Sequence, residues 1–217
     1  MHALALHLRV LRGLREDELS PQALAELCAP MDAAMRAMSS QLTRLLQLSR
    51  LEAGEARVSL RSIAVDEVMS AVAAHFGLQA QDKGLRLRMQ TQARVHAARV
   101  HSVPKMLQSI IDNLVSNAVR HTERGGVLLA ARRRGGQLLF QVFDTGPGIA
   151  AEQLPQIFIA YRRFDDRDRE SHDGSGQGLG LALARKQPDL LSHTLAVRSV
   201  PERGSVFSLA VPLAAPA

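Results

Sequence analysis

Apolar residues recur with a helical period over residues 1–52, which open the chain. Ser20 and Pro21 have the residue types of an N-cap and a first helical residue, and Pro30 is expected to kink the helix or delay its start. An apolar seam with spacings of three and four follows: Leu24, Leu27, Met31, Met35, Met38, Leu42 and Leu45. This spacing is typical of a helical bundle or coiled coil, so the pattern predicts an α-helical hairpin.

The period of the pattern changes near residue 57. Two long amphipathic helices are predicted at 65–81 and 104–122, and a third helix is expected to begin near Gly178. Segments with alternating or continuous apolar residues predict strands: 85–89, 127–133, 137–143, 194–199 and 205–211. Helices combined with a mixed, largely antiparallel sheet give an α+β fold, arranged as an α/β sandwich.

Composition limits the kind of core and the compartment. Hydrophobic residues make up 46% of the 217 residues and aromatic residues only 3%, so the core must be aliphatic. A single cysteine, Cys28, excludes an internal disulfide. No apolar run reaches the ~18 residues that a spanning helix needs. The sequence therefore predicts a soluble, cytoplasmic segment without direct membrane insertion, which could be the cytoplasmic part of a membrane-bound sensor.

The net charge of +6 raises the question of nucleic-acid binding. The densest basic runs are 132–134 and 162–163, but acidic residues are scattered throughout and stacking aromatics are nearly absent. Polyphosphate binding together with a solvated surface explains the charge better. The sequence therefore predicts no nucleic-acid partner.

The helix expected at 104–122 has two faces of different chemistry. One face is apolar, whereas Asn113, Asn117, Arg120 and His121 share the other. Amide oxygens suit a hard cation such as Mg²⁺, and an arginine one turn on can reach phosphate oxygens. By itself this face is also compatible with a plain solvent-exposed surface.

Two glycine motifs follow this helix. Asp144 ends an apolar strand and precedes Gly146 and Gly148, which allow backbone to approach a ligand closely; a simple turn has the same composition. Residues 174–180 are dense in glycine and lead into a helix, where backbone N–H groups and the helix dipole favour phosphate. A flexible linker is the alternative for that loop, and it is not a Walker motif.

These motifs, followed by Gly204-Ser-Val-Phe207, occur in one order: Asn113 to Thr122, Asp144 to Ile149, Gly174 to Leu181 and Gly204 to Phe207. In this order they resemble the N box and glycine boxes of the catalytic domain of sensor histidine kinases, especially hybrid kinases. The wider superfamily contains gyrase, chaperone and mismatch-repair ATPases. The resemblance covers about residues 57–213 and implies that the chain binds ATP and Mg²⁺.

The resemblance also implies a role for each site residue. Asn117 is the expected Mg²⁺ ligand with Asn113 beside it, Arg120 contacts phosphate, and His121 stands where the family often has tyrosine. The adenine end and the phosphate end are then formed by the remaining candidates: Asp144, Gly146, Gly148, Tyr161, Arg163, Gly176, Gly178, Leu179 and Gly180. Residues 164–175 correspond to a mobile lid.

Three residues depart from the family pattern at the far end of the domain. Pro188 falls where the last helix should continue, and Ser192 and Glu202 stand where glycine is usual. These departures concern the edge of the domain more than the nucleotide site.

The first helices resemble the dimerisation and phosphotransfer hairpin of the same family. The expected domains are thus a partial hairpin at 1–54 and an ATP-binding catalytic domain at 55–217. The resemblance implies a homodimer through the N-terminal helices and transfer of the γ-phosphate to a hairpin histidine, then to an aspartate on a response regulator receiver domain. His2 and His7 lack an acidic neighbour, so the phosphoacceptor is expected to be absent from this chain, which then would not phosphorylate itself.

Two other functions are compatible with the same motifs. The chain could be another ATPase of the superfamily, or a non-catalytic ATP-binding module that acts through helical dimerisation. The sequence favours a protein histidine kinase over both.

Overall fold

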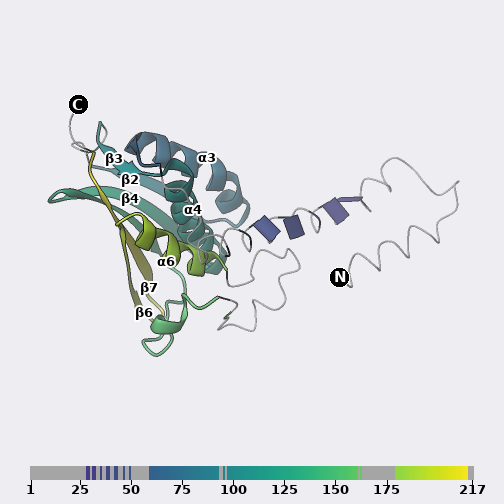
Figure 1. Ribbon diagram of the computed structural model, residues 1–217. Coiled ribbons are helices and arrows are strands. Elements are labelled where there is room, and N and C mark those ends of the chain that lie inside the picture. Colours follow the sequence, from purple (N-terminus) through teal and green to yellow (C-terminus); the bar gives the residue numbers. More distant parts are fainter. Residues whose placement is uncertain are drawn as a thin grey trace, which may run out of the picture. The chain divides into compact units, whose positions relative to one another are not determined.

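The computed structural model describes residues 59–160 except 93, 94 and 96, together with 162, 179–214 and eleven residues spread over 28–49. The chain divides into two compact units. One comprises Met1–Ser49 and Arg163–Gln177, and the other Arg50–Arg162 and Gly178–Ala217. The sheet, the helices labelled in Figure 1 and most of the candidate site belong to the second unit.

A five-stranded mixed sheet is the centre of the second unit. Its strands are β2 (Arg86–Thr91), β4 (Gly126–Arg134), β5 (Gln137–Asp144), β7 (Gly204–Pro212) and β6 (Thr194–Val200), in that order across the sheet. Only the β2–β4 pair is parallel among them. The predicted strands are therefore confirmed, including the hairpin between β4 and β5.

Three helices lie on one side of this sheet, as Figure 1 shows. They are α3 (Val65–Asp82), α4 (Pro104–His121) and α6 (Gly180–Leu190). Pro104 occupies the first turn of α4, where its missing N–H costs no hydrogen bond. A short 3₁₀ helix, η3 (Leu154–Gln156), precedes the residues that the structure leaves undescribed. The α/β sandwich expected from the sequence is confirmed.

A second, two-stranded sheet was not predicted. It pairs β1 (Arg61–Ala64) with β3 (Arg99–Ser102) in antiparallel fashion, and Val100 forms a bridge with Leu213. Each strand has four residues and little apolar alternation, so no strand pattern is visible in the sequence. Through this sheet, β1 near the start of the second unit and Leu213 near its end are both hydrogen-bonded to β3.

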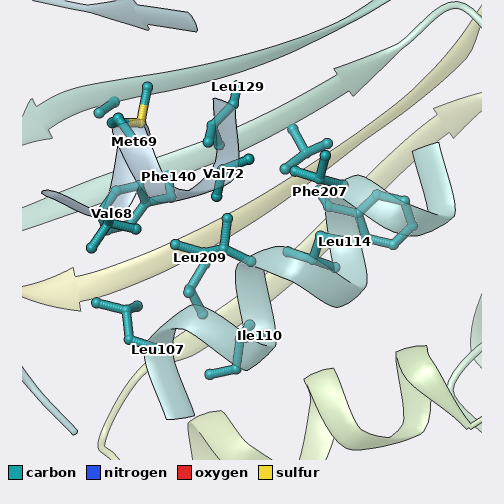
Figure 2. Packing of buried hydrophobic residues seen from close by; sticks show 14 of the residues in the cluster. Val68, Met69, Val72, Leu107, Ile110, Leu114, Leu129, Phe140, Phe207 and Leu209 are labelled. Atoms are coloured by element: carbon teal, nitrogen blue, oxygen red, sulfur yellow. The ribbon is translucent and has the colours of Figure 1, made fainter. Parts of the chain in front are cut away.

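The core fills the space between the helices and the helix-facing side of the large sheet (Figure 2). The apolar face of α4 is fully buried there, as its periodicity predicts. The labelled side chains in Figure 2 come from both layers: Val68, Met69, Val72, Leu107, Ile110, Leu114, Leu129, Phe140, Phe207 and Leu209. Burial of this face fixes the rotation of α4, and with it the direction of its polar face.

The side chain of Lys83 binds backbone carbonyls at the C-terminal end of α4. Its Nζ donates to the carbonyl oxygens of Val119 and Arg120, both at 2.8 Å, and to that of Thr122 at 3.5 Å. The last carbonyls of a helix lack intrahelical partners and carry partial negative charge, so a lysine there is stabilising. Burial lowers the pKa of Lys83, an effect that the charge of Glu123 opposes.

Pro188 lies inside α6 rather than ending it. It is in the last turn, so few hydrogen bonds are lost, and its carbonyl accepts from the N–H groups of Leu191 and His193. The helix ends at Leu190, two residues after the proline.

Ser192 and Glu202 adopt left-handed backbone conformations, with φ of 56° and 62°. These are two of the positions where glycine was expected, and both turns need a positive φ, which costs a side chain about 1–2 kcal/mol. We predict that Ser192→Gly and Glu202→Gly each raise the free energy of unfolding in urea by about 0.5–1 kcal/mol, since the extra freedom of glycine in the unfolded chain offsets part of the gain.

The matched control is Ser70→Gly on the exposed side of α3, where the backbone is already helical. Glycine should there lower the free energy of unfolding by about 0.5–1 kcal/mol. A loss of stability in both Ser192→Gly and Glu202→Gly would contradict the assignment of strain to these turns.

His193 is a buried histidine immediately before β6. It is only 5% exposed, and its Nε2 lies 2.8 Å from the buried Oγ of Ser102. Burial lowers the pKa of His193 from 6.5 to about 4, although a backbone hydrogen bond with Ser192 opposes this. The folded protein therefore holds the neutral ring across the mildly acidic range.

Because the unfolded chain takes up this proton more readily, we predict that stability falls as the pH drops from 6.5 towards 4. A pKa shift of this size lowers the free energy of unfolding by about 3 kcal/mol at the acidic end of the range, near pH 4. Burial raises the pKa values of Asp112 and Asp144, which act in the opposite direction. The measurement is therefore the difference between the wild type and His193→Asn in urea unfolding across this range; parallel pH profiles would contradict the prediction.

The described residues of the first unit are helical wherever they fall between 28 and 49. Four apolar side chains on these helical residues are exposed: Met35 at 63%, Met38 at 47%, Leu42 at 60% and Leu46 at 57%. Most of the predicted hairpin, including Leu24 and Leu27, lies outside the described residues. Among the described residues, no helix is both long and apolar enough to span a bilayer.

Candidate functional site

The polar face of α4 lies beside the start of α6. Asn113 and Asn117, one helical turn apart, are both half-buried. A Cβ placed on Gly180 would lie 3.1 Å from Oδ1 of Asn113, so the backbone that opens α6 approaches this amide closely. The structure thus brings the first sequence motif together with Gly180, in the described end of the third motif, and places the N-terminal end of a helix at the asparagine face.

Asp144 ends β5 and has its carboxylate anchored by backbone. Oδ1 accepts hydrogen bonds from the N–H of Gly146 at 2.9 Å and from the N–H of Ser205 at 3.2 Å. Burial raises the pKa of Asp144, while these two bonds and the nearby charge of His121 act to lower it. Both anchoring bonds fall on one oxygen, so Oδ2 is the atom that can accept from a ligand.

The loop after Asp144 packs tightly on the end of α4. A Cβ on Gly146 would lie 3.2 Å from the carbonyl oxygen of His121 and 3.0 Å from Oδ1 of Asp144. Any larger residue at this position would have to push one of these groups away. The second motif is therefore held against the polar end of α4, where Arg120 and His121 lie.

The turn between β6 and β7 packs against the other side of the loop that follows Asp144. Gly148 has a φ of +71°, and a Cβ there would overlap the carbonyl of Val200. The N–H of Glu202 donates to the carbonyl of Pro147 at 2.7 Å. The N–H of Ile149 donates to Oγ of Ser199, also at 2.7 Å. The loop is thus fixed on both sides, which preorganises the position of Asp144.

Thr145, Ser199 and Ser205 are site-forming residues that sequence reasoning missed. Oγ1 of Thr145 donates to the carbonyl of Arg124 and accepts from the N–H of Gly126, so it ties the chain after α4 to the end of β5. The only sequence signal was the place of Thr145 and Ser205 inside two of the motifs; Ser199 lies in a predicted strand outside them. Their hydrogen bonds join segments far apart in the chain, which no local pattern reveals.

Nine of the thirteen candidate residues fall within the described part of the chain. Leu179, the residue before α6, is 3% exposed, so its side chain packs inward. The asparagine, arginine, histidine, aspartate and glycine candidates of the first two motifs form the arrangement above. Four candidates lie outside the described residues: Tyr161, Arg163, Gly176 and Gly178.

The donors on the α4 face are suited to a hard cation. Among the described residues no three His, Cys, Asp or Glu side chains gather into a metal site. A divalent ion held here would therefore depend on the amide oxygens of Asn113 and Asn117 and on ligand phosphates. Mg²⁺ accepts such sparse, oxygen-only ligand sets because it retains several waters.

A family model described as histidine kinase-, DNA gyrase B-, and HSP90-like ATPase matches residues 102–215. The chain is 31% identical over 169 residues to the circadian input-output histidine kinase CikA of Synechococcus elongatus, covering 77% of this chain and 22% of CikA. It is 30% identical over 197 residues to the sensory/regulatory protein RpfC of Xanthomonas campestris pv. campestris, covering 85% of this chain and 26% of RpfC. The chain thus spans about a quarter of these relatives.

Two solved structures share the fold. Full-length ShkA in complex with AMPPNP superposes with a TM-score of 0.78 at 25% identity, covering 99% of this chain and 43% of ShkA. The histidine kinase AdeS of Acinetobacter baumannii has a TM-score of 0.73 at 18% identity, covering 97% of this chain and 93% of that chain. The second likeness supports the fold alone.

Proposed function

Since this chain belongs to the histidine kinase-, DNA gyrase B- and HSP90-like ATPase family, we propose that it is the ATP-binding catalytic region of a sensor histidine kinase. The observation that carries the proposal is the anchored carboxylate of Asp144 beside the polar end of α4. This arrangement suits a nucleoside triphosphate. It has a fixed hydrogen-bond acceptor at one end, and a helix N-terminus with amide oxygens at the other.

In this proposal the adenine amine donates to Oδ2 of Asp144. Gly146 and Gly148 form the adjoining wall because their lack of a side chain lets the base approach the backbone. The N-terminal end of α6 at Gly180 and the side chain of Arg120 face the phosphates. Tyr161, Arg163, Gly176 and Gly178 are assigned to the same site on the motif resemblance alone.

Asn117, with Asn113 beside it, would hold Mg²⁺, which supplies neutralisation of phosphate charge. The chain's own part is to orient the triphosphate and to stabilise charge with Arg120 and backbone N–H groups. The γ-phosphate then passes to a histidine on the helical hairpin and on to an aspartate of a response regulator. A region that consumes ATP in this way would lie in the cytoplasm.

We expect ATP to bind in a magnesium-dependent manner, as measured by calorimetry. Removing Mg²⁺ with a chelator should weaken ATP binding about tenfold, which corresponds to about 1.4 kcal/mol. Asn117→Ala should lose this dependence, whereas Gln108→Ala, elsewhere on α4, should keep it. Equal binding heats with and without Mg²⁺ would contradict the metal assignment, and absence of heat in both would contradict the proposed function.

The phosphate acceptor is proposed to lie outside the 217 residues. Incubation of the chain with γ-labelled ATP and Mg²⁺ should then give ATP binding without acid-labile label on the protein. Label that disappears in His7→Gln would contradict this and make His7 the acceptor. Steady release of inorganic phosphate would instead favour another ATPase of the family.

Dimerisation through the N-terminal helices is part of the proposal. The exposed Met35, Met38, Leu42 and Leu46 support it, because such a series of apolar side chains on a helix is stabilised by a partner helix. We expect a dimer by sedimentation at tens of micromolar, and a monomer for the double variant Met38→Glu/Leu42→Glu. A monomeric wild type would overturn this part.

A further inference from the structure

A groove separates α3 from the edge strand β2. Its volume is about 430 Å³. Ala73, Gly77 and Gln81 of α3 line one wall, and Leu87 and Met89 of β2 line the other. A Cβ on Gly77 would meet nothing within 4 Å, so small residues on α3 leave this space open.

The outer edge of β2 offers backbone groups beside this groove. The N–H of Arg86 donates to Gly125 and that of Gln92 to Ala131, so even-numbered residues hydrogen-bond towards β4. The N–H and C=O groups of the odd residues, including Leu87 and Met89, therefore point away from the sheet. No strand among the described residues pairs with that edge.

The opposite side of β2 is basic. Arg86 and Arg88 are exposed there, and β2 contains no acidic residue. Neither arginine has a carboxylate partner in the described part of the chain. Charged residues on an edge strand commonly prevent aggregation. This edge differs because the same strand also borders an open groove, into which Leu87 and Met89 of β2 contribute apolar surface.

We propose that the β2 edge is a docking site for an extended segment of a partner protein, which adds to the sheet as a sixth strand. The segment has alternating apolar and acidic residues. Its apolar side chains enter the groove between α3 and β2, and its carboxylates face Arg86 and Arg88. Main-chain hydrogen bonds then supply affinity, and the alternating side chains supply specificity.

The partner is a different protein rather than a second copy of this chain. Pairing two β2 strands edge to edge would place their arginines together, which is unfavourable. The other edge strand, β6, also carries an arginine, Arg198, and no acidic residue. In the described part of the chain, neither edge strand of the large sheet therefore carries the acidic residues that would complement β2.

The probe is a fluorescein-labelled hexapeptide of alternating valine and glutamate, whose length matches β2. Binding to the full 217-residue chain is followed by fluorescence anisotropy. Gly77→Leu fills the groove from a position with free space, so the variant should fold and bind the probe at least about tenfold more weakly. Arg86→Glu/Arg88→Glu should also lose the probe and should instead bind the matched valine–lysine hexapeptide.

Two controls distinguish strand addition from nonspecific binding of the peptide. Arg198→Glu, on the far edge of the sheet, should leave probe affinity unchanged. A hexapeptide N-methylated at alternate residues along one edge should lose binding, whereas methylation along the other edge should not. ATP affinity should be the same in Gly77→Leu as in the wild type, so loss of the probe does not depend on the nucleotide site.

Several results would overturn the proposal. They are no binding of the probe at millimolar concentration, equal affinity in Gly77→Leu, and equal affinity of both N-methylated peptides. Binding of anionic lipid vesicles in preference to the probe would also overturn it, because the basic strand would then be a membrane-facing surface.

Discussion

Asp144→Asn is expected to weaken ATP binding by about 10- to 100-fold. Asparagine keeps an oxygen that accepts from the N–H groups of Gly146 and Ser205, so the loop should stay in place. The second position, Oδ2, changes from a charged acceptor to a donor, and in the proposed site it would face the adenine amine. Loss of a charge-assisted hydrogen bond costs about 1.5–3 kcal/mol, which gives the expected range. Calorimetry with Mg²⁺ and ATP measures it.

Asp112→Asn is the matched control for this substitution. Burial raises the pKa of Asp112 as it does that of Asp144, but Asp112 accepts from Gln108 and pairs with His75 on the other side of α4. Its amide variant should therefore bind ATP as the wild type does. Unchanged affinity in Asp144→Asn, or an equal loss in both variants, would contradict the adenine role.

Gly204→Ala is expected to be a strongly destabilising substitution. Gly204 has a φ of +94°, and a Cβ there would overlap the backbone carbonyl of Asp144. Backbone cannot rotate aside as a flexible side chain can, so strain and overlap add. We expect a loss of about 3 kcal/mol or more in the free energy of urea unfolding. ATP binding should fall as well, because the overlap displaces Asp144.

The hairpin between β4 and β5 provides two controls in the same protein. Gly135 has a φ of +59° and Gly136 does not have a positive φ, and an added Cβ meets nothing within 4 Å at either. Gly135→Ala should therefore cost only the conformational strain of about 1–2 kcal/mol, and Gly136→Ala close to nothing. If Gly204→Ala lowers the free energy of unfolding no more than Gly135→Ala does, the inferred steric overlap with the carbonyl of Asp144 is contradicted.

Much of the large sheet and its helices could be predicted because their signals are local. α4 begins with proline at the first helical position and repeats apolar residues with a helical period, so its extent was predicted to within one residue. The strands β4 and β5 are apolar runs around Gly135 and Gly136. In contrast, β1 and β3 each contribute one buried apolar side chain to the core, Ile63 and Val100. The sequence around these two residues shows no apolar periodicity that would predict a strand.

The candidate site was predictable as a set of residues but not as a geometry. The motifs named Asn113, Gly180 and Asp144 without indicating which of them meet. The contact of Gly180 with Asn113 joins residues 67 positions apart (180 − 113), and the bond from Ser205 to Asp144 joins residues 61 apart. Such contacts depend on strand order and register, which local composition does not encode.

The hydrogen bonds of Lys83 have a mechanical consequence. Its neighbours Gln81 and Gly84 border the groove, while its Nζ donates to the carbonyls of Val119 and Arg120 at the end of α4. Lys83 therefore links the turn between α3 and β2 to the backbone of Arg120 at the end of α4. Any coupling through this link between the two proposed sites is reciprocal: if an added strand tightens ATP binding, ATP tightens binding of the strand by the same factor.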